Sequence, residues 1–337
     1  VSGGEREEYM SRPYIDLHCD TLLKEILSGR LYDNPENMLD VARMAEAGQC
    51  AQFFAVFFPP PVPEDARPGD FPAPPPLSDD ELFERARALL LRTVSHHPKS
   101  LRMAYCAQDL EENIREGLCS AFLTIEDGRA VAGDFGKLRA FYDMGVRAMA
   151  LTWNFPNCFG YPNSRDPEVM NRGLTPFGKE AVREMNRMGM LIDVSHLSDG
   201  GFWDVCALSG KPFIASHSNC RALCDHPRNL TDEMIRALAD KGGVAGVNFA
   251  PEFLSENAGG FSRVEDICRH VLHLLRVGGE DCPALGTDFD GIMGQFEVGQ
   301  PTQMHRLFDA LSRQGVTERQ LDKFARENAL RVIRETL

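Results

Sequence analysis

Eight short apolar runs, separated by longer segments with helical spacing, constrain the fold of this 337-residue chain more than any other feature. Eight strands that alternate with helices over this length predict a (β/α)8 TIM-like barrel. An open doubly wound sheet is the alternative, but no G-x-G-x-x-G motif follows the first run. The expected strands are 14–18, 51–58, 120–126, 147–153, 190–196, 212–217, 243–249 and 284–288.

Several of the intervening segments repeat apolar residues with the period of an amphipathic helix, among them 79–97, 175–189, 231–242 and 261–279. Thr231 is the expected N-cap of the third of these helices, and Gly242 is its stop signal. Ser262 and Glu265 are expected to form a capping box at the start of the fourth. These signals place helices between successive strands, as a barrel requires.

The chain is expected to form one barrel domain over residues 13–337. Residues 1–12 are expected to be a disordered lead or a remnant of the expression vector. The segment 59–76, directly after the second expected strand, holds nine prolines and therefore cannot be regular helix or inner strand. We expect a rigid surface loop at the carboxyl end of that strand, in preference to a substrate lid.

The charge balance excludes some classes of partner. The chain has 36 basic and 50 acidic residues, a net charge of −14, which argues against a nucleic-acid or anionic-membrane surface. No apolar run reaches the roughly 18 residues of a transmembrane helix, and the start lacks the apolar core of a signal peptide. Ten scattered cysteines without a CxxC pair predict reduced thiols in a cytoplasmic protein.

Several of the apolar runs end in a polar residue. Because the carboxyl ends of all strands of a barrel meet on one face, these side chains are expected to converge there. Asp20 follows His18 by two residues, so both project to one side of an extended strand end. The residues at the run ends are His18, Glu126, His196, His217 and Asp288.

Each of these residues has an ordinary structural explanation when it is taken alone. His18 and Asp20 can be a polar strand terminus, His196 can be a hydrogen-bonded interior histidine, and Asp288 can cap a helix. Burying three carboxylates with two or three imidazoles, however, is very unfavourable without a cation. His and carboxylate ligands make zinc the default metal, with manganese, iron or cobalt as alternatives. Asp193, three residues before His196, is expected on the opposite strand face as a supporting or packing residue.

The number of potential ligands exceeds what one metal needs, because a zinc ion with an open site takes three protein ligands. A site with two zinc ions per chain and Glu126 as the bridge would use all five ligands and leave room for a bridging hydroxide. Asp288 would then be free to act as general acid and base. The five ligands are His18, Asp20, Glu126, His196 and His217.

The motifs DLHCDT, TIEDG, IDVSH, SHSNCRALCDHPRN and LGTDFDG, in this order, resemble the membrane dipeptidase (renal dipeptidase) family of zinc peptidases, with features of its bacterial members. The resemblance spans roughly residues 13 to 335. It implies a barrel with a binuclear zinc site, in which Glu126 is shared by a His18–Asp20 zinc and a His196–His217 zinc. It also implies that Arg228 holds the substrate's terminal carboxylate and that Asp288 is the acid–base residue. Family members hydrolyse dipeptides, often with a D-residue at the C-terminus, some open β-lactams, and most are homodimers.

One stretch departs from the mammalian members of that family, which carry a substrate-contacting histidine after the fourth strand. Here the matching position is Trp153, and Asn154 follows it as a possible polar substrate contact. Ala250 stands near a position where some members have a tyrosine. These differences leave the substrate preference open.

Three functions therefore compete. The first is a metallodipeptidase. The second is another binuclear, amidohydrolase-like barrel hydrolase that acts on cyclic amides, lactones, β-lactams or phosphoesters. Such enzymes often begin with H-x-H and use a bridging lysine, whereas here Asp20 follows Cys19 and the fourth strand ends in Trp153. The third is a non-catalytic metal-binding relative, which should have lost ligands, although all five are present. The fold alone cannot decide between them.

Overall fold

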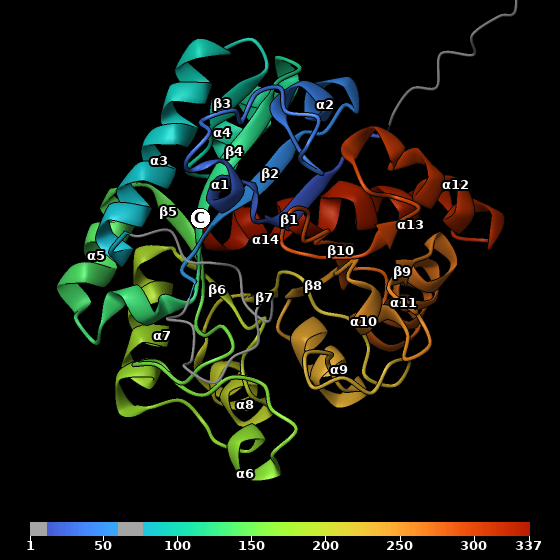
Figure 1. Ribbon diagram of the computed structural model, residues 1–337. Helices are drawn as coiled ribbons and strands as arrows, with labels where there is room; N and C mark the ends of the chain where they lie inside the picture. Colours follow the sequence, from blue (N-terminus) through green and yellow to red (C-terminus); the bar gives the residue numbers. More distant parts are fainter. Residues whose placement is uncertain (1–11, 60–76) are drawn as a thin grey trace, which may run out of the picture.

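The computed structural model describes residues 12–59 and 77–337. Eight parallel strands form a closed barrel in the order β2-β1-β10-β8-β7-β6-β5-β4, and pairing of β2 with β4 closes it. The predicted (β/α)8 barrel is therefore confirmed, with helices around it (Figure 1). The barrel strands are β1 (Ile15–Cys19), β2 (Ala51–Phe57), β4 (Cys119–Glu126), β5 (Val146–Ala150), β6 (Leu191–Asp193), β7 (Ile214–Ala215), β8 (Val244–Val247) and β10 (Pro283–Leu285).

Three short strands lie outside the barrel and were not predicted. β3 (Leu101–Met103) pairs with the start of β4, and β9 (Phe261–Ser262) pairs with β11 (Gln295–Phe296). Two or three residues are too few to display the alternation that identifies a strand. Several barrel strands are also shorter than expected, because the chain leaves the sheet before the polar residues at the ends of the predicted runs.

The helices have the following bounds: α1 (Thr21–Glu25), α2 (Val41–Glu46), α3 (Asp79–His96), α4 (Ala107–Arg115), α5 (Phe135–Asp143), α6 (Pro167–Met170), α7 (Pro176–Met188), α8 (Asp199–Leu208), α9 (Asp232–Asp240), α10 (Pro251–Leu254), α11 (Val264–Gly278), α12 (His305–Arg313), α13 (Glu318–Asp322) and α14 (Asn328–Thr336). Short 3₁₀ turns, η1 (Gly128–Val131) and η2 (Pro301–Gln303), and a π-helical turn, η3 (Lys323–Glu327), complete the elements.

The helix caps agree with the sequence at one of the two predicted positions. Thr231 caps α9 through its side chain, as expected. The predicted capping box of Ser262 and Glu265 is wrong, because Arg263 is the N-cap of α11 and makes no side-chain cap. Ser262 is instead held in β9, and Glu297 accepts a hydrogen bond from the Val264 amide at 2.7 Å. The hydrogen bond at the start of α11 therefore comes from Glu297, which is distant in the sequence, and not from the neighbouring Ser262.

The barrel interior forms its own apolar cluster, which α14 closes at one end. Ile15, Leu191 and Val244 begin their strands and pack in one cluster with Leu330 and Ile333 of α14. α14 therefore covers the amino-terminal end of the barrel, beside β1 and β10 (Figure 1). The carboxyl-terminal end, where barrel enzymes place their active sites, is left for the polar residues.

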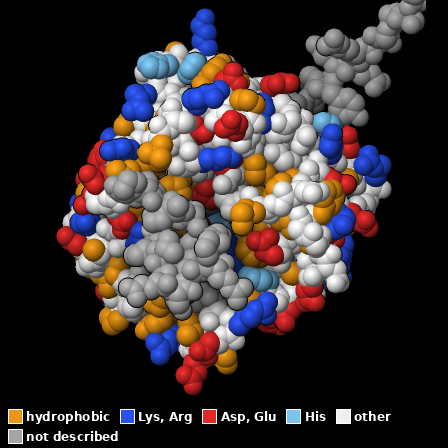
Figure 2. All heavy atoms as spheres, viewed as in Figure 1, with side chains coloured by type: hydrophobic (Ala, Val, Ile, Leu, Met, Phe, Trp, Pro, Cys, Tyr) orange, Lys and Arg blue, Asp and Glu red, His pale blue; other side chains and the backbone are white. Residues whose placement is uncertain are grey.

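The structure also bears on the predictions about cysteine thiols, membrane-spanning helices and the proline-rich segment. All ten cysteines are free thiols. Within residues 12–59 and 77–337, no helix is both long and apolar enough to cross a membrane. Figure 2 shows basic and acidic side chains interspersed over the visible face. Nearly all of the proline-rich segment and of the predicted lead lie outside the described residues.

Candidate metal centre

Six polar side chains converge at the carboxyl-terminal end of the barrel. None of the six is more than 11% exposed. They arise from β1, β4 and β10 or the turns that follow them, and from the turns after β6 and β7. The six are His18, Asp20, Glu126, His196, His217 and Asp288, which are the five predicted ligands and the predicted acid–base residue.

Irregularities in the strands determine the direction in which these side chains point. The register between β1 and β2 shifts between Asp16 and Cys19. This shift lets Leu17 join the interior cluster while its neighbour His18 reaches the polar site, which strict alternation would forbid. A second shift, between Leu123 and Thr124, precedes Glu126 in β4. Bulges of this kind are common at barrel rims, where they redirect functional side chains.

Glu126 lies in the middle of the cluster and presents one oxygen to each side. Its Oε2 lies 3.3 Å from His18 Nε2. Its Oε1 lies 3.0 Å from His196 Nε2 and 3.7 Å from His217 Nε2. The carboxylate thus divides the cluster into a carboxylate half (His18, Asp20 and Asp288) and an imidazole half (His196 and His217). A carboxylate with one oxygen toward each half is suited to bridge two cations.

In the carboxylate half, acidic groups surround one histidine. His18 Nε2 lies 3.5 Å from Asp20 Oδ2 and 3.8 Å from Asp288 Oδ1. Burial alone would lower the pKa of His18, but Glu126 and Asp20 together raise it well above its ordinary value. Burial, reinforced by Asp20, raises the pKa of Glu126 to about 8 and that of Asp288 to about 7. Without metal, this half therefore retains protons near neutral pH.

In the imidazole half, burial lowers the pKa of both histidines well below the ordinary value, with a further contribution from nearby cationic groups. Their Nε2 atoms lie only 3.0 Å apart. His196 Nδ1 lies 3.0 Å from Asn154 Oδ1, a pure acceptor, so Nδ1 carries the proton and Nε2 carries a lone pair. Two Nε2 lone pairs 3.0 Å apart repel each other, so the two neutral rings present them together only to a cation, which is how neutral imidazoles bind metals.

The donor set can be tested against a metal on the structure itself. His18 Nε2 and Asp20 Oδ1 are buried and make no well-directed hydrogen bond with the described residues, although Glu126 Oε2 lies 3.3 Å from His18 Nε2. Unpartnered buried polar atoms are costly, and a cation between them would remove that cost. Ligand atoms of His18, Glu126 and His217 lie within 4.8 Å of one another, as do those of His18, Asp20 and Asp288. The residues therefore fit metal ions, with Asp288 itself within reach of the carboxylate half.

Backbone strain and one close approach accompany this geometry. His196 and Asp288 have positive φ angles of 69° and 63°. Such conformations cost free energy in non-glycine residues and are concentrated at functional sites. A Cβ atom on Gly291 would lie 2.0 Å from Asp20 Oδ2 and 2.5 Å from Asp288 Oδ1. Gly291 is thus a site residue that the sequence did not reveal, because only the fold brings it against the two carboxylates.

Arg228, predicted to hold a substrate carboxylate, lies beside the imidazole half. Its guanidinium donates to Ser218 Oγ and to the His217 carbonyl, both at 3.0 Å, while its Nε has no acceptor among the described residues. The side chain stacks over Phe253, and burial lowers its pKa to about 10. No carboxylate of the described residues lies within ion-pair distance of Arg228. A buried cation with free donor capacity and no anionic partner suits an anionic ligand.

Trp153 and Asn154, the two other predicted substrate contacts, lie next to the imidazole half. Trp153 packs on Phe57 and Phe155, and its ring centroid lies 6.1 Å from that of His196. The Asn154 amide, which the sequence offered as a polar substrate contact, holds His196 Nδ1. Ala250 is fully buried and is the N-cap of α10.

Two further polar residues close to the site, Asp290 and His226, have structural partners. Asp290 accepts hydrogen bonds from Thr21 and from the amides of Met38 and Leu39, which joins the loops after β1 and β10. His226 accepts the Arg228 amide and packs against Phe253 with tilted rings. Neither residue contributes to the clusters that could hold a metal among the described residues.

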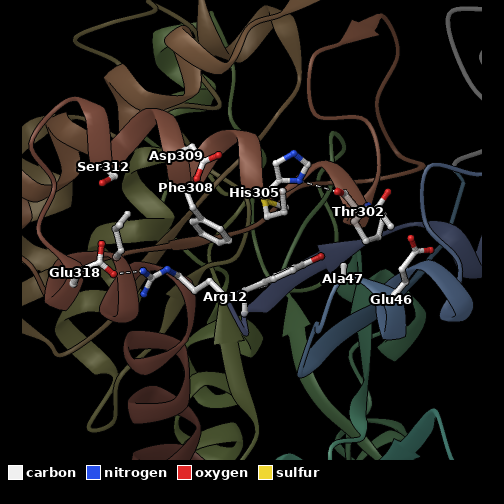
Figure 3. Close-up of a pocket in the computed structure, with 13 residues that line it drawn as sticks. Arg12, Glu46, Ala47, Thr302, His305, Phe308, Asp309, Ser312 and Glu318 are labelled. Atoms are coloured by element: carbon white, nitrogen blue, oxygen red, sulfur yellow. Dashed lines mark hydrogen bonds and ion pairs between the residues drawn. The ribbon is translucent and has the colours of Figure 1, made fainter. Parts of the chain in front are cut away.

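A cavity of about 620 Å³ lies elsewhere and contains none of the six site residues. α2, η2, α12 and α13 line it, together with Arg12 and Tyr14 (Figure 3). The Arg12 guanidinium is directed at Glu318 and also pairs with Asp322, so its charge is compensated. This cavity shows no convergent set of chemically active groups, unlike the cluster at the barrel end.

Residues 7–337 match the model of a family described as membrane dipeptidase, peptidase family M19. A Klebsiella pneumoniae protein, described only as an uncharacterized protein in the pqqA 5′ region, is 37% identical over 255 residues, which cover 73% of this chain and 93% of that protein. An uncharacterized dipeptidase of Schizosaccharomyces pombe is 30% identical over 307 residues, which cover 88% and 72% of the two chains.

Two solved structures are similar along almost the whole chain. A metallopeptidase of family M19, described as dipeptidase AC, has a TM-score of 0.85 and 29% identity, with 97% of this chain and 99% of that chain covered. A metallopeptidase from Rhodobacter sphaeroides, liganded with a phosphinate mimic of the dipeptide L-Ala-D-Ala, has a TM-score of 0.87 and 29% identity, with 97% and 100% covered.

Proposed function

Since this chain belongs to the membrane dipeptidase family, peptidase family M19, we propose that it hydrolyses dipeptides with the help of two zinc ions at the end of its barrel. The observation that carries the proposal is the position of Glu126, whose two oxygens face separate groups of ligand atoms. His18, Asp20 and Glu126 would hold one zinc. Glu126, His196 and His217 would hold the other.

Zinc is the metal proposed, because imidazole and carboxylate donors suit it and no cysteine takes part in the two potential metal clusters of the described residues. When bound, paired zinc ions lower the pKa of water to near neutrality and polarise a carbonyl group. The protein supplies the low exposure of the site, which strengthens each electrostatic interaction within it.

Asp288 is proposed as the residue that takes a proton from the attacking water and gives it to the leaving amine. Asn248 donates a hydrogen bond to its Oδ2 at 2.8 Å, which leaves Oδ1 directed toward the cluster. Burial raises its pKa to about 7 in the absence of metal. A pKa close to neutral is the value at which one carboxyl group both accepts and returns a proton efficiently.

Arg228 is proposed to bind the C-terminal carboxylate of the substrate. Its free donor capacity and its lack of an anionic partner among the described residues support this role. Its contact with the His217 carbonyl keeps it close to the proposed metal ligands. A fixed carboxylate site so near the reacting centre favours dipeptides over longer chains.

The substrate class can be narrowed by analogy. The Rhodobacter sphaeroides relative was solved with a mimic of L-Ala-D-Ala. We propose that this chain also accepts a D-residue at the C-terminal position. Trp153, beside His196, is proposed to line the pocket. A homodimeric assembly and a cytoplasmic location remain predictions from the sequence.

The deciding experiment measures the zinc content of the purified protein and the hydrolysis of L-Ala-L-Ala and L-Ala-D-Ala, with and without a chelator. We expect about two zinc ions per chain and cleavage that the chelator abolishes. L-Ala-D-Ala amide, which lacks the C-terminal carboxylate, is the matched substrate control and should be cleaved poorly. Two metals without dipeptide cleavage would move the substrate to cyclic amides, lactones or β-lactams. Absence of bound metal after zinc is supplied would contradict the proposal.

Arg228→Ala tests the carboxylate contact. Truncating one partner of a buried charged contact costs about 2–5 kcal/mol, which corresponds to a fall of roughly 30-fold to several thousand-fold in kcat/KM. Arg228→Lys keeps the charge but not the planar fork and should recover only part of the loss. If Arg228→Ala cleaved dipeptides with an unchanged kcat/KM, the assignment would be wrong.

A further inference from the structure

Asp193, at the end of β6, collects hydrogen bonds from the two segments that carry the imidazole half. Its Oδ1 accepts the amides of Ser195 and Ser216, both at 2.9 Å. Its Oδ2 accepts the Ser216 hydroxyl at 2.5 Å. Ser195 directly precedes His196, and Ser216 directly precedes His217. One buried carboxylate therefore fastens the backbone beside both histidines.

The Ser216 hydroxyl connects this carboxylate to an imidazole ring, because Ser216 Oγ also lies 2.7 Å from His217 Nδ1. A hydroxyl has one proton to donate, and an ionised carboxylate can only accept. The Ser216 proton therefore points to Asp193, which leaves the hydroxyl oxygen as an acceptor for His217 Nδ1–H. The alternative acceptor, Ser195 Oγ, is more distant at 3.4 Å and uncharged.

The direction of these hydrogen bonds fixes the tautomer of His217. With the proton on Nδ1, the lone pair lies on Nε2, which faces His196 Nε2 at 3.0 Å and Glu126 Oε1 at 3.7 Å, where a cation would bind. That is the form in which Nε2 can bind a metal. His196 reaches the same tautomer through Asn154. His196 is thus held by a side-chain amide, whereas His217 is held by a hydroxyl that a carboxylate orients.

The same serines extend the network to Arg228. Ser195 Oγ accepts the His217 amide at 3.1 Å and lies 3.2 Å from Ser218 Oγ. Ser218 Oγ in turn accepts Arg228 Nη1–H. The groups proposed to hold a metal and to hold the substrate carboxylate are therefore parts of one buried hydrogen-bond network.

We propose that Asp193 is a positioning residue that acts through Ser216 to hold His217 as the Nδ1–H tautomer, ready to bind a metal through Nε2. The sequence had placed Asp193 on the opposite strand face, as a supporting or packing residue. The inference deepens the proposed function, because it concerns a proposed metal ligand, but the tautomer itself can be measured without metal or substrate.

The hydrogen bonds that run from Asp193 through Ser216 to His217 form a relay. Asp193→Asn tests the direction of these hydrogen bonds with a side chain of the same shape. Both backbone amides that point at Oδ1 require an acceptor, so the substituted side chain must place its carbonyl oxygen there. Its NH2 group then replaces Oδ2 and donates to Ser216 Oγ. The Ser216 proton is released from the carboxylate and turns to His217 Nδ1, which moves the ring proton to Nε2 and blocks metal binding.

The first measurement is the ¹⁵N chemical shift pattern of His217 in metal-free His196→Ala protein, assigned by comparison with the same protein carrying His217→Gln. His196→Ala removes the Nε2 atom that lies 3.0 Å from His217 Nε2 and would otherwise compete for the ring proton. We expect Nδ1–H in this background and a shift toward Nε2–H when Asp193→Asn is added. Asp16→Asn is the matched control. Asp16 is a buried carboxylate that accepts the Thr287 amide and hydroxyl and, at 3.5 Å, the His18 amide, but among the described residues it has no hydrogen-bond connection to an imidazole nitrogen and none to His217. An unchanged tautomer in Asp193→Asn would overturn the proposal.

The second measurement is zinc affinity, by competition with a chelator. Outer hydrogen-bond partners of metal ligands typically contribute 10–100-fold, so we expect a loss of that size in Asp193→Asn. In a Ser216→Ala background, which cuts the relay, Asp193→Asn should cause little further loss. Additive losses would mean that Asp193 only supports the backbone. If the natural chain bound no zinc while His217 kept the Nδ1–H tautomer, the proposed function would fail and the relay would stand.

Discussion

The two halves of the cluster around Glu126 are suited to bind a cation for different reasons. The carboxylate half gathers negative charge around His18, so its groups hold protons that a metal would have to displace. The imidazole half contains two neutral rings, each oriented by a hydrogen bond at Nδ1. The first half attracts a cation by charge, whereas the second presents free lone pairs. Similar ligand types are therefore prepared for a cation by different physical means within one site.

The largest expected effect comes from Glu126→Gln, which removes the charge that the two halves share. Loss of a bridging ligand should exceed the 10–100-fold effects of outer-shell residues, so we expect kcat/KM to fall by about a thousandfold or more. Zinc content should fall in both halves together. Glu180→Gln, on the exposed face of α7, is the control and should leave both quantities unchanged. Loss of zinc from one half alone would mean that Glu126 is not shared.

Gly291→Ala should damage the carboxylate half selectively. The added Cβ would lie within 2.0 Å of Asp20 Oδ2 and 2.5 Å of Asp288 Oδ1, so these carboxylates must move. We expect the loss of one zinc per chain, retention of the other, and a fall in kcat of roughly 10–100-fold, since a small misplacement of reacting groups has effects of this size. Metal analysis and steady-state kinetics measure the two effects.

Gly210→Ala is the control for this substitution, because the nearest atom to its added Cβ is Asn186 Oδ1 at 3.8 Å. It should retain the zinc content and activity of the natural chain. Equal zinc loss from both halves in Gly291→Ala would contradict the separation of the site into two independently prepared parts.

The smallest expected effect is a difference in pH dependence. Glu126 and Asp288 have pKa values raised to about 8 and about 7, so below pH 8 these two groups bind protons that zinc must displace. Despite its burial, the pKa of His18 is also raised, because Glu126 and Asp20 favour its charged form. Zinc affinity should therefore increase as the pH rises from about 6 to about 8, by about tenfold per pH unit for each proton released. His196 and His217 are already neutral and should release none.

Titration calorimetry in buffers of different ionisation heat counts the protons released on zinc binding. We expect the count to decrease as the pH rises through the pKa values of about 7 and about 8, where Asp288 and Glu126 lose their protons in the metal-free protein, and to decrease at neutral pH when Asp288 is changed to Asn. A proton count that did not vary with pH would show that the carboxylate half holds no protons in the metal-free protein.

The sequence by itself determined the barrel and most of the polar cluster. Strand and helix periods are local properties, and residues such as His18 and His217 follow buried runs, so strand-end convergence brings them together. It did not determine β3, because three residues carry no period, nor the start of α11, because Glu297 supplies the cap from a distant segment.

Only the tertiary structure decided how the site residues are held. The register shift in β1 redirects His18, Gly291 makes room for two carboxylates, and Asp193 reaches His217 through Ser216. Asn154, expected to contact substrate, binds His196. These contacts join residues that are far apart in the chain. Their free energies depend on distances of a few tenths of an ångström, which residue order and local periodicity do not encode.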